Sequence, residues 1–328
     1  MADVSRTIDS LGTQKKLAWM RVLAVTFTSR TLKKSITFGV NHELGKDDLS
    51  IKVDGYKYMS TLKDACTIKI DNLTYSEIVQ LVQGQFYEVD VKAGYKNGNI
   101  MTVFKGGVLY ISNALNDRKT HTAIILCASN LVARFGQNRI NLSLNSGINL
   151  YSAINFVCRR AGIPNTNVST QFKKKFLAEI MNVNDTAGSW IDKLCSQNSS
   201  YISNSDSITD STLSIFDALK SNNRIITLDS KTIDLTGGFP RLNTNGLSLT
   251  LMPTFAFMCG DIIKIDNSII NIGAQGTAEA NKNLGMYLDK DGCYMITEQH
   301  YQLENRGPSF SLELTCKARS LISNVSSR

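Results

Sequence analysis

Short runs in which apolar and polar residues alternate recur along most of this chain. The clearest runs are Cys66 to Ile70, Tyr87 to Lys92 and Phe310 to Lys317. A period of two is typical of a β-strand with one buried side and one solvent-facing side. The pattern therefore predicts a mainly β protein.

The first group of strands is predicted between residues 21 and 128. Its expected strands are Arg21 to Ser29, Ile36 to Val40, Leu49 to Val53, Cys66 to Ile70, Gln85 to Ala93, Ile100 to Phe104, Val108 to Ser112 and Thr120 to Ala128. Residues 96–99 form a turn in this interpretation, Gly106-Gly107 separates two strands, and Thr74 to Leu81 is a short amphipathic helix. Closely spaced strands with polar turns favour a barrel or a sandwich.

A helical period replaces the alternation in the middle of the chain. Apolar residues between Asn149 and Ala161 fall on one face of a helix. These residues are Leu150, Ala153, Ile154, Val157, Cys158 and Ala161. Gly162 and Pro164 end this helix, because glycine permits a C-terminal cap and proline cannot continue the helix.

A second helix is predicted to open at residues 184–187, with Trp190, Ile191 and Leu194 facing inward. Serine and asparagine crowd residues 197–207, which we interpret as a loop, and residues 212–219 as a weaker helix. The middle of the chain is therefore expected to be mixed α and β.

Strands return after residue 224 and form a second β-rich region of similar size. The expected strands are Arg224 to Leu228, Leu247 to Met252, Asp261 to Ile265, Tyr294 to Gln299 and Phe310 to Ala318. No sequence repeat links the two regions. The predicted organisation is an N-terminal arm (1–20), a first β-barrel domain (21–130), a mixed α/β domain (131–223), a second β-barrel domain (224–320) and a C-terminal tail (321–328).

Composition indicates a folded protein with a basic balance. The chain has 328 residues, 42% of them hydrophobic and 20% charged, and only four prolines. The net charge of +8 is compatible with nucleic acid, a membrane surface or an acidic protein as partner. Basic residues cluster tightly only at Lys173-Lys174-Lys175, with a smaller pair at Lys15-Lys16, so we favour a modest excess spread over a large surface.

Cysteine use indicates a reducing compartment. The seven cysteines are Cys66, Cys127, Cys158, Cys195, Cys259, Cys293 and Cys316. None has the spacing of a zinc site or a redox pair, and several lie in apolar patterns. No disulfide framework is expected. Residues 1–6 lack an apolar signal core, and no window approaches the roughly 20 apolar residues of a spanning helix, so we expect folding in a cytoplasm and no membrane insertion.

Recognisable catalytic chemistry is missing from the sequence. His42, His121 and His300 are far apart and match no metal-ligand motif. Gly106-Gly107 and Gly237-Gly238 are interpreted as turns rather than a phosphate-binding loop, and Asp47-Asp48 as a solvated pair. We therefore predict no catalytic, cofactor-binding or metal site and no cofactor, and we expect that the protein is not an enzyme.

Binding of nucleic acid would require exposed aromatic residues among basic ones. The nearest candidate is Tyr95, between Lys92 and Lys96. A tyrosine that packs at the rim of a barrel is the preferred interpretation of this position.

Two stretches carry a resemblance to a known family. The first runs from Thr67 to Ser112 and includes Ile68 to Leu73, Val91 to Tyr95 and Phe104 to Val108. The second begins at Gly238-Phe239-Pro240-Arg241-Leu242 and continues through Leu247 to Leu249, Gly260 to Ile265, Tyr294 to Thr297 and Glu304 to Gly307. From about Arg21 to Ala318, the chain resembles the baseplate hub (tail hub) proteins of tailed bacteriophages.

The resemblance implies two tail-tube-like β-barrel domains with smaller mixed domains between and around them. It implies a homotrimer whose six barrels form a pseudo-six-fold ring between the hexameric tail tube and the trimeric central spike. It also implies contacts with the tail tube protein, the central spike protein, the tape measure protein and other baseplate proteins, and a place in the virion after assembly in the host cytoplasm. Genomic DNA would pass through the lumen without specific binding, so we expect the basic excess on outer or inter-protein surfaces.

Two other functions compete with this structural one. A β-barrel nucleic-acid-binding protein would use the +8 charge and would bind DNA with a steep salt dependence. A tail-associated wall hydrolase would require a cleft with convergent carboxylates or a metal, which the sequence does not indicate.

Overall fold

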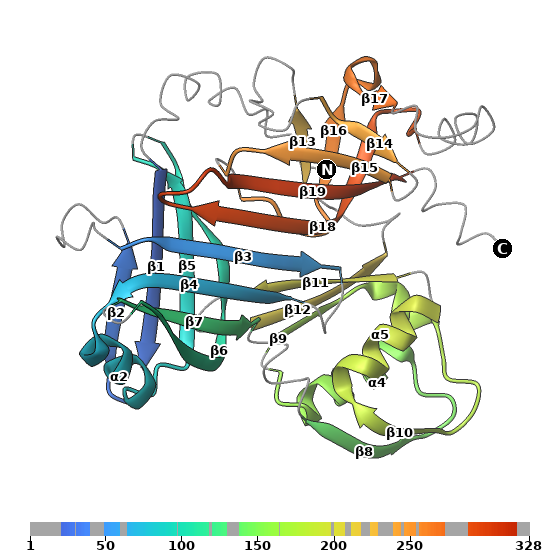
Figure 1. The fold of residues 1–328 in the computed structure, drawn as a ribbon. Helices are drawn as coiled ribbons and strands as arrows, with labels where there is room; N and C mark the ends of the chain where they lie inside the picture. The colour runs from blue at the N-terminus through green and yellow to red at the C-terminus, as the bar shows by residue number, and fades with distance from the viewer. Residues whose placement is uncertain are drawn as a thin grey trace.

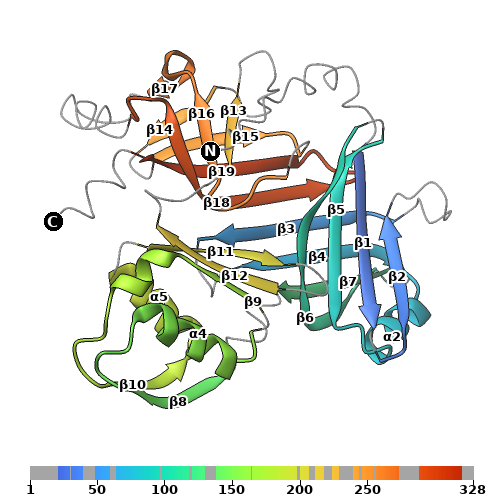
Figure 2. The same ribbon diagram turned by 180° about the vertical axis from the view of Figure 1, so that it is seen from behind.

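The computed structural model describes most of the chain between residues 21 and 319 (Figure 1, Figure 2). The described residues are 21–29, 31–39, 49–59, 64–96, 98–117, 120–129, 138–163, 165–197, 200–206, 211–217, 224–228, 239–243, 246–253, 256–272 and 288–319. The predictions for the N-terminal arm, His42, Asp47-Asp48, Gly237-Gly238 and the C-terminal tail lie outside these residues.

The first β-rich region contains the strands predicted for it. They are β1 (Arg21–Ser29), β2 (Lys34–Gly39), β3 (Ile51–Tyr58), β4 (Ala65–Leu73), β5 (Glu88–Tyr95), β6 (Ile100–Asp117) and β7 (Thr120–Ala128). Their core-facing residues alternate with outward ones, as in β3, where Ile51, Val53 and Gly55 are buried and Lys52 and Asp54 are exposed.

The predicted break at Gly106-Gly107 is wrong, because both glycines lie inside the 18-residue strand β6. Residues 100–107 of β6 pair with β5, whereas residues 107–117 pair with β7. A Cβ atom on Gly106 would collide with the carbonyl oxygen of Ala128 and the ring of Phe104. Glycine therefore serves here as the point where one strand changes partners, not as a turn.

The predicted short helix is confirmed as α2 (Tyr75–Gln83), which buries Ile78 and Leu81. Thr74 caps it. The Thr74 hydroxyl accepts from the backbone N–H of Glu77, and the Glu77 carboxylate accepts from the backbone N–H of Thr74. This reciprocal capping box satisfies two of the amides that a helix start leaves without intrahelical partners.

Replacing Thr74 by alanine is expected to lower the free energy of unfolding by about 1 kcal/mol, because one cap hydrogen bond is lost. Urea unfolding followed by circular dichroism measures the change. Serine at the same position keeps the hydroxyl and should restore most of the stability. Equal stability of the alanine variant and the parent would contradict the prediction.

The middle of the chain is mixed α and β, as predicted. Its elements are β8 (Arg139–Leu144), α4 (Leu150–Arg160), β9 (Asn165–Val168), η1 (Thr170–Lys174), β10 (Met181–Thr186), α5 (Ala187–Gln197), β11 (Ser200–Asp206) and β12 (Ser211–Asp217). The predicted inward face of α4 is confirmed, and Trp190, Ile191 and Leu194 of α5 are buried as expected. Within the described residues, no helix combines the length and apolar character needed to cross a membrane.

Two predictions in this part are wrong. Residues 200–206, which lie within the predicted loop at 197–207, form β11. Residues 211–217, which overlap the predicted helix at 212–219, form β12, and β12 pairs with β11 antiparallel. Leu213 and Ile215 are both fully buried two positions apart, which is the period of a strand. The backbone of β11, rich in polar residues, pairs with β12, and β12 also pairs with β9 in parallel.

The second β-rich region also contains the predicted strands. Its elements are β13 (Ile225–Leu228), β14 (Arg241–Asn243), β15 (Gly246–Leu251), β16 (Ile262–Ile265), η2 (Asn267–Ile269), β17 (Asn271–Ile272), β18 (Cys293–Glu304) and β19 (Phe310–Ala318). β14 and β17 match none of the predicted strands, because they are too short to show alternation.

The mainly β class is confirmed, and the two β-rich regions join in one 14-stranded sheet. Its main path runs β17-β14-β15-β19-β18-β3-β4-β7-β6-β5-β1-β2, and β16 with β13 branches from β18. Across the described strands this path stays open, with ends at β17 and β2. One buried apolar cluster draws side chains from both β-rich regions, and a separate cluster fills the mixed middle.

Candidate functional site

The structure describes His121 and His300, and it does not bring these two histidines together. His121 lies on β7 opposite Leu73, where its ring contacts Asn113 and Tyr75. His300 lies on β18 opposite Tyr56, at the other end of the paired strands. In the described part of the chain, no group of three or more His, Cys, Asp or Glu side chains is placed to hold a metal ion.

The cysteines behave as core residues. All seven are free, and six of them are buried, as their apolar surroundings predicted. Burial raises the pKa of the Cys66, Cys158 and Cys195 thiols to about 12. Thiols with such values remain protonated at neutral pH and are poor nucleophiles.

Tyr95, the candidate for stacking on nucleic acid, is buried. Its ring meets Phe310 of β19 edge-on, with 5.5 Å between the ring centroids. The preferred interpretation as a packed tyrosine is therefore right. The contact also links the last residue of β5 to the first residue of β19.

The central feature of the molecule is the seam where the two β-rich regions pair, formed by β3 and β18 (Figure 1). Residues 52–58 of β3 face residues 298–304 of β18 in antiparallel register. Tyr301 lies directly opposite Gly55, and both are buried. A Cβ atom on Gly55 would overlap the Tyr301 ring and hydroxyl. The missing side chain at residue 55 is what allows this large aromatic ring to cover the seam.

The turn between β18 and β19 is tied to the first region by Asn305. The Asn305 Oδ1 atom accepts from the backbone N–H of Ile51 at 2.8 Å, and Nδ2 donates to the carbonyl of Leu49 at 2.8 Å. The backbone N–H of Asn305 donates to the Ile51 carbonyl at 3.2 Å. One side chain thus extends the sheet pairing beyond the end of β18.

Arg21, at the start of β1, holds the same turn from another side. Its Nη1 atom donates to the carbonyl of Gly307 at 2.6 Å, and its guanidinium lies 5.2 Å from the centre of the Phe310 ring. Backbone hydrogen bonding and cation–π attraction act together here. The seam therefore has contacts from β1, β3 and β5 to a single hairpin of the second region.

Replacing Asn305 by alanine is expected to lower the free energy of unfolding by about 2 kcal/mol, because the buried N–H of Ile51 and the carbonyl of Leu49 each lose a partner. Chemical unfolding followed by circular dichroism, which reports the sheet directly, gives the value. Gln302→Ala is the matched control, since this exposed amide lies on β18, three residues before Asn305 in the chain. Equal effects of the two substitutions would show that Asn305 does not hold the seam.

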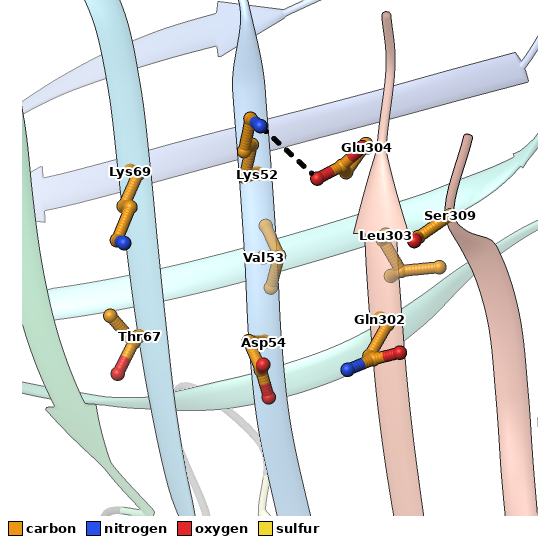
Figure 3. A pocket seen from close by; sticks show the side chains of 9 residues that line it. All are labelled: Lys52, Val53, Asp54, Thr67, Lys69, Gln302, Leu303, Glu304 and Ser309. Atoms are coloured by element: carbon orange, nitrogen blue, oxygen red, sulfur yellow. Dashed lines mark ion pairs between the residues drawn. The ribbon is translucent and has the colours of Figure 1, made fainter. Parts of the chain in front are cut away.

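Polar side chains cover the solvent side of the seam and form a shallow hollow of about 280 Å³. Figure 3 shows its lining residues on neighbouring strands. Glu304, Lys52 and Lys69 form one cross-strand row, and Gln302, Asp54 and Thr67 form the next. Lys52 pairs with Glu304 at 3.2 Å (Figure 3).

Beyond these rows lies a group of aromatic and acidic side chains. The His300 ring stacks on Tyr56 at 4.0 Å, and its Nε2 atom lies 3.1 Å from Asp54 Oδ1. Burial, together with the nearby Glu298 carboxylate, raises the pKa of Tyr58 to about 12. The rows on this side thus carry the carboxylates of Asp54, Glu298, Glu304 and Glu313 and the amines of Lys52 and Lys69. Such a surface offers little attraction to a polyanion.

No protein-family model matches the chain, and no curated protein matches it. The chain does match solved structures. A 43 kDa tail protein of prophage MuSo2 from Shewanella oneidensis has a TM-score of 0.56 and 11% identity, over 92% of this chain and 98% of that one. A tail protein from Neisseria meningitidis MC58 has a TM-score of 0.54 and 10% identity, over 91% and 97%.

A third structure comes from a secretion system. The E. coli c3393 protein is described as a component of the type VI secretion system with structural similarity to T4 bacteriophage tail proteins gp27 and gp5. Its TM-score is 0.55 with 12% identity, over 82% of this chain and 73% of that one. The chain therefore has the fold of these tail proteins, which confirms the resemblance seen in the sequence at the level of the fold.

The seam could not be identified from the sequence. Glu304 to Gly307 lie among the stretches that carry the resemblance, yet no contact was predicted for Asn305. One signal was present: Gly55 occupies an inward position of an alternating strand, where an apolar side chain is expected. A glycine there often marks the close approach of another group.

Proposed function

We propose that this chain is a structural subunit of a phage tail baseplate: a hub protein that forms a homotrimeric, pseudo-six-fold ring. In this role it joins the hexameric tail tube to the trimeric central spike and lines the channel through which DNA leaves. The protein acts by its shape and its interfaces, without catalysis.

The observation that carries this proposal is the continuous sheet across the seam. A ring with six similar positions built from three chains requires each chain to present two β units side by side in a fixed relation. The β3–β18 pairing and the contacts of Asn305 and Arg21 supply that relation within one chain.

The sheet edges support assembly with further copies. Residues 109–117 of β6 pair only with β7 among the described strands, so their other edge is open. Leu109 and Tyr110 are more than half exposed there, and the neighbouring Leu126 is 43% exposed. Open edges with apolar side chains favour uncontrolled pairing unless a partner covers them. Closed rings of identical subunits are one way to cover such edges.

The polar face of the seam supports a channel wall. Its mixture of carboxylates and amines, with carboxylates in excess, suits a surface along which DNA slides without being held. In this arrangement the basic excess of the chain lies on outer and inter-protein surfaces. The tail tube protein contacts one side of the ring and the spike the other, with the tape measure protein and other baseplate proteins as additional partners in the virion.

Light scattering of the purified protein, alone and mixed with the spike protein encoded by the same phage, tests the proposal. A trimer, or a trimer formed only with the spike, is the expected result. A monomer under both conditions would overturn the ring. Steep, salt-dependent binding of duplex DNA by that monomer would instead favour the nucleic-acid-binding function.

A further inference from the structure

A cavity lies where the sheet of the first β-rich region is interrupted. β4 begins at Ala65 and β7 ends at Ala128, and these two residues pair with each other. β3 continues past this point to Tyr58, whereas residues 102–105 of β6 pair with β5 alone among the described strands. Residues 256–259 of the second β-rich region lie across the resulting gap. A cavity of about 250 Å³ remains between β3, β6 and residues 256–259.

Part of the cavity wall is apolar. Phe104 and Phe257 line it and are only 1% and 8% exposed, so their rings belong to its inner wall. Met258 also lines it and is 41% exposed, which places this side chain toward solvent. An apolar cavity of roughly 150 Å³ can hold a benzene molecule. The larger volume here therefore has room for one ring and a small polar group.

Lys57 brings positive charge to the cavity. Its half-buried side chain lines the wall, and no ion pair holds its amine among the described residues. Burial raises the pKa of the Cys259 thiol and the Lys57 charge opposes this shift, so the amine lies near Cys259, which also lines the cavity. The second lysine of the wall, Lys105, is paired with Asp90 at 3.8 Å. Asp64, the acidic residue of the wall, accepts from a backbone N–H at 2.8 Å. Lys57 is thus the cation of the wall that is left to hold a ligand.

A buried amide lies beside Lys57. Gln299 of β18 is directly opposite Lys57 of β3, and directly opposite residues place their side chains on the same side of a sheet. Gln299 is 3% exposed, and its Nε2 atom is buried without a hydrogen-bond partner in the described part of the chain. Buried donors nearly always have a partner, because leaving one unpaired is costly. An ammonium and an amide donor side by side favour a ligand with acceptor oxygens.

We propose that this cavity binds a carboxylate attached to one apolar group of about the size of a phenyl ring. The carboxylate accepts from the Lys57 amine and the Gln299 amide, and the apolar group lies against Phe104 and Phe257. Two sources have this chemistry. One is a free aryl or alkyl acid, and the other is the C-terminal residue of a polypeptide that ends in an apolar side chain.

This proposal goes beyond the ring and does not depend on it. Every residue of the wall comes from one chain, so a monomer has the cavity as well. Failure of the ligand to bind would leave the ring intact, and a monomeric protein could still bind the ligand.

The test is a ligand-observed NMR titration of the full-length protein with 3-phenylpropionate. We expect a dissociation constant of roughly 1 mM or below, which is ordinary for a ligand of this size. The neutral 3-phenylpropanamide has a similar shape and should bind at least about tenfold more weakly, because it lacks the charge that pairs with Lys57. A tetrapeptide of three glycines and a C-terminal phenylalanine separates the two sources. Tighter binding than the free acid indicates a polypeptide terminus, and weaker binding indicates a small acid.

Substitutions assign the binding to the cavity. Lys57→Met keeps the length of the side chain without its charge and should weaken binding about tenfold. Gln299→Leu removes the amide donor at similar size and should weaken binding about threefold. This variant should resist urea at least as well as the parent, since it also removes an unpaired buried group, so lost binding is not lost folding. Lys52→Met is the matched control, because Lys52 lies on the same strand but pairs with Glu304 on the solvent side.

The control should bind 3-phenylpropionate like the parent. Equal binding of the acid and the amide, equal binding by Lys57→Met and the parent, or no binding by the parent would overturn the proposal. Loss of binding in Lys52→Met would also overturn it, since charge on the solvent side of the seam would then hold the acid.

Discussion

Replacing Gly55 by valine is expected to lower the free energy of unfolding by about 3 kcal/mol, at the upper end of what overpacking costs. The added side chain would enter the space that the Tyr301 ring and hydroxyl fill. Tyr301 is only 1% exposed and lies on a strand paired on both sides, so neither the ring nor the backbone can withdraw easily. Urea unfolding of both proteins, compared at the same temperature, measures the loss.

Gly98→Ala provides the matched control. A Cβ atom at this turn would lie 3.6 Å from the Cβ atom of Tyr95, an ordinary contact, so little change is expected. A double-mutant cycle identifies the cause. In a Tyr301→Ala background the Gly55→Val change should cost much less, because the volume it requires is then free. A full penalty in that background would show that the strain does not come from Tyr301.

Elements with a strong period and a clear cap could be predicted from the sequence. Helix α4 carries apolar residues on a single face and a glycine just past its end, so both its face and its C-terminal end were right. β11 and β12 could not be predicted in the same way. The serines and asparagines of β11 resemble a loop, and the stretch that forms β12 was interpreted as a helix. Backbone pairing of β12 with β11 and with β9 makes these segments strands. Local patterns do not contain that information.

The seam could not be predicted from the sequence, for a related reason. Its contacts join residues that are far apart in the chain, such as Ile51 and Asn305, which are 254 positions apart. Alternation shows that β3 and β18 each have an inner side, but it does not say which strands are neighbours. The sequence predicted two β-rich regions around a mixed middle, and the structure shows that their strands continue into one sheet.

A shared sheet has a consequence for assembly. Because the two β-rich regions share one buried apolar cluster, they are expected to unfold together rather than as independent units. A subunit whose two halves are fixed in this way presents both of its sheet ends in a defined orientation. A ring can then close with a single type of contact between copies, because the contact between the two β-rich regions already exists within each chain.

Substitutions in this contact between copies are expected to weaken the proposed assembly strongly. If the open edge of β6 meets the next copy, Leu126→Glu or Tyr110→Glu places a carboxylate in a buried interface without a partner. These two residues lie directly opposite each other on β7 and β6. We expect each change to raise the dissociation constant of the proposed trimer at least about 100-fold, which corresponds to roughly 2.8 kcal/mol. Light scattering over a range of protein concentrations measures the shift.

Ile100→Glu is the control for this experiment, because Ile100 is 50% exposed and lies at the start of β6, in the half that pairs with β5. It should leave the trimer unchanged. Unfolding curves of all three variants should match the parent monomer, since the altered side chains already contact solvent. A trimer that persists at micromolar concentration in both Leu126→Glu and Tyr110→Glu would show that copies do not meet along β6, and the ring would require another edge.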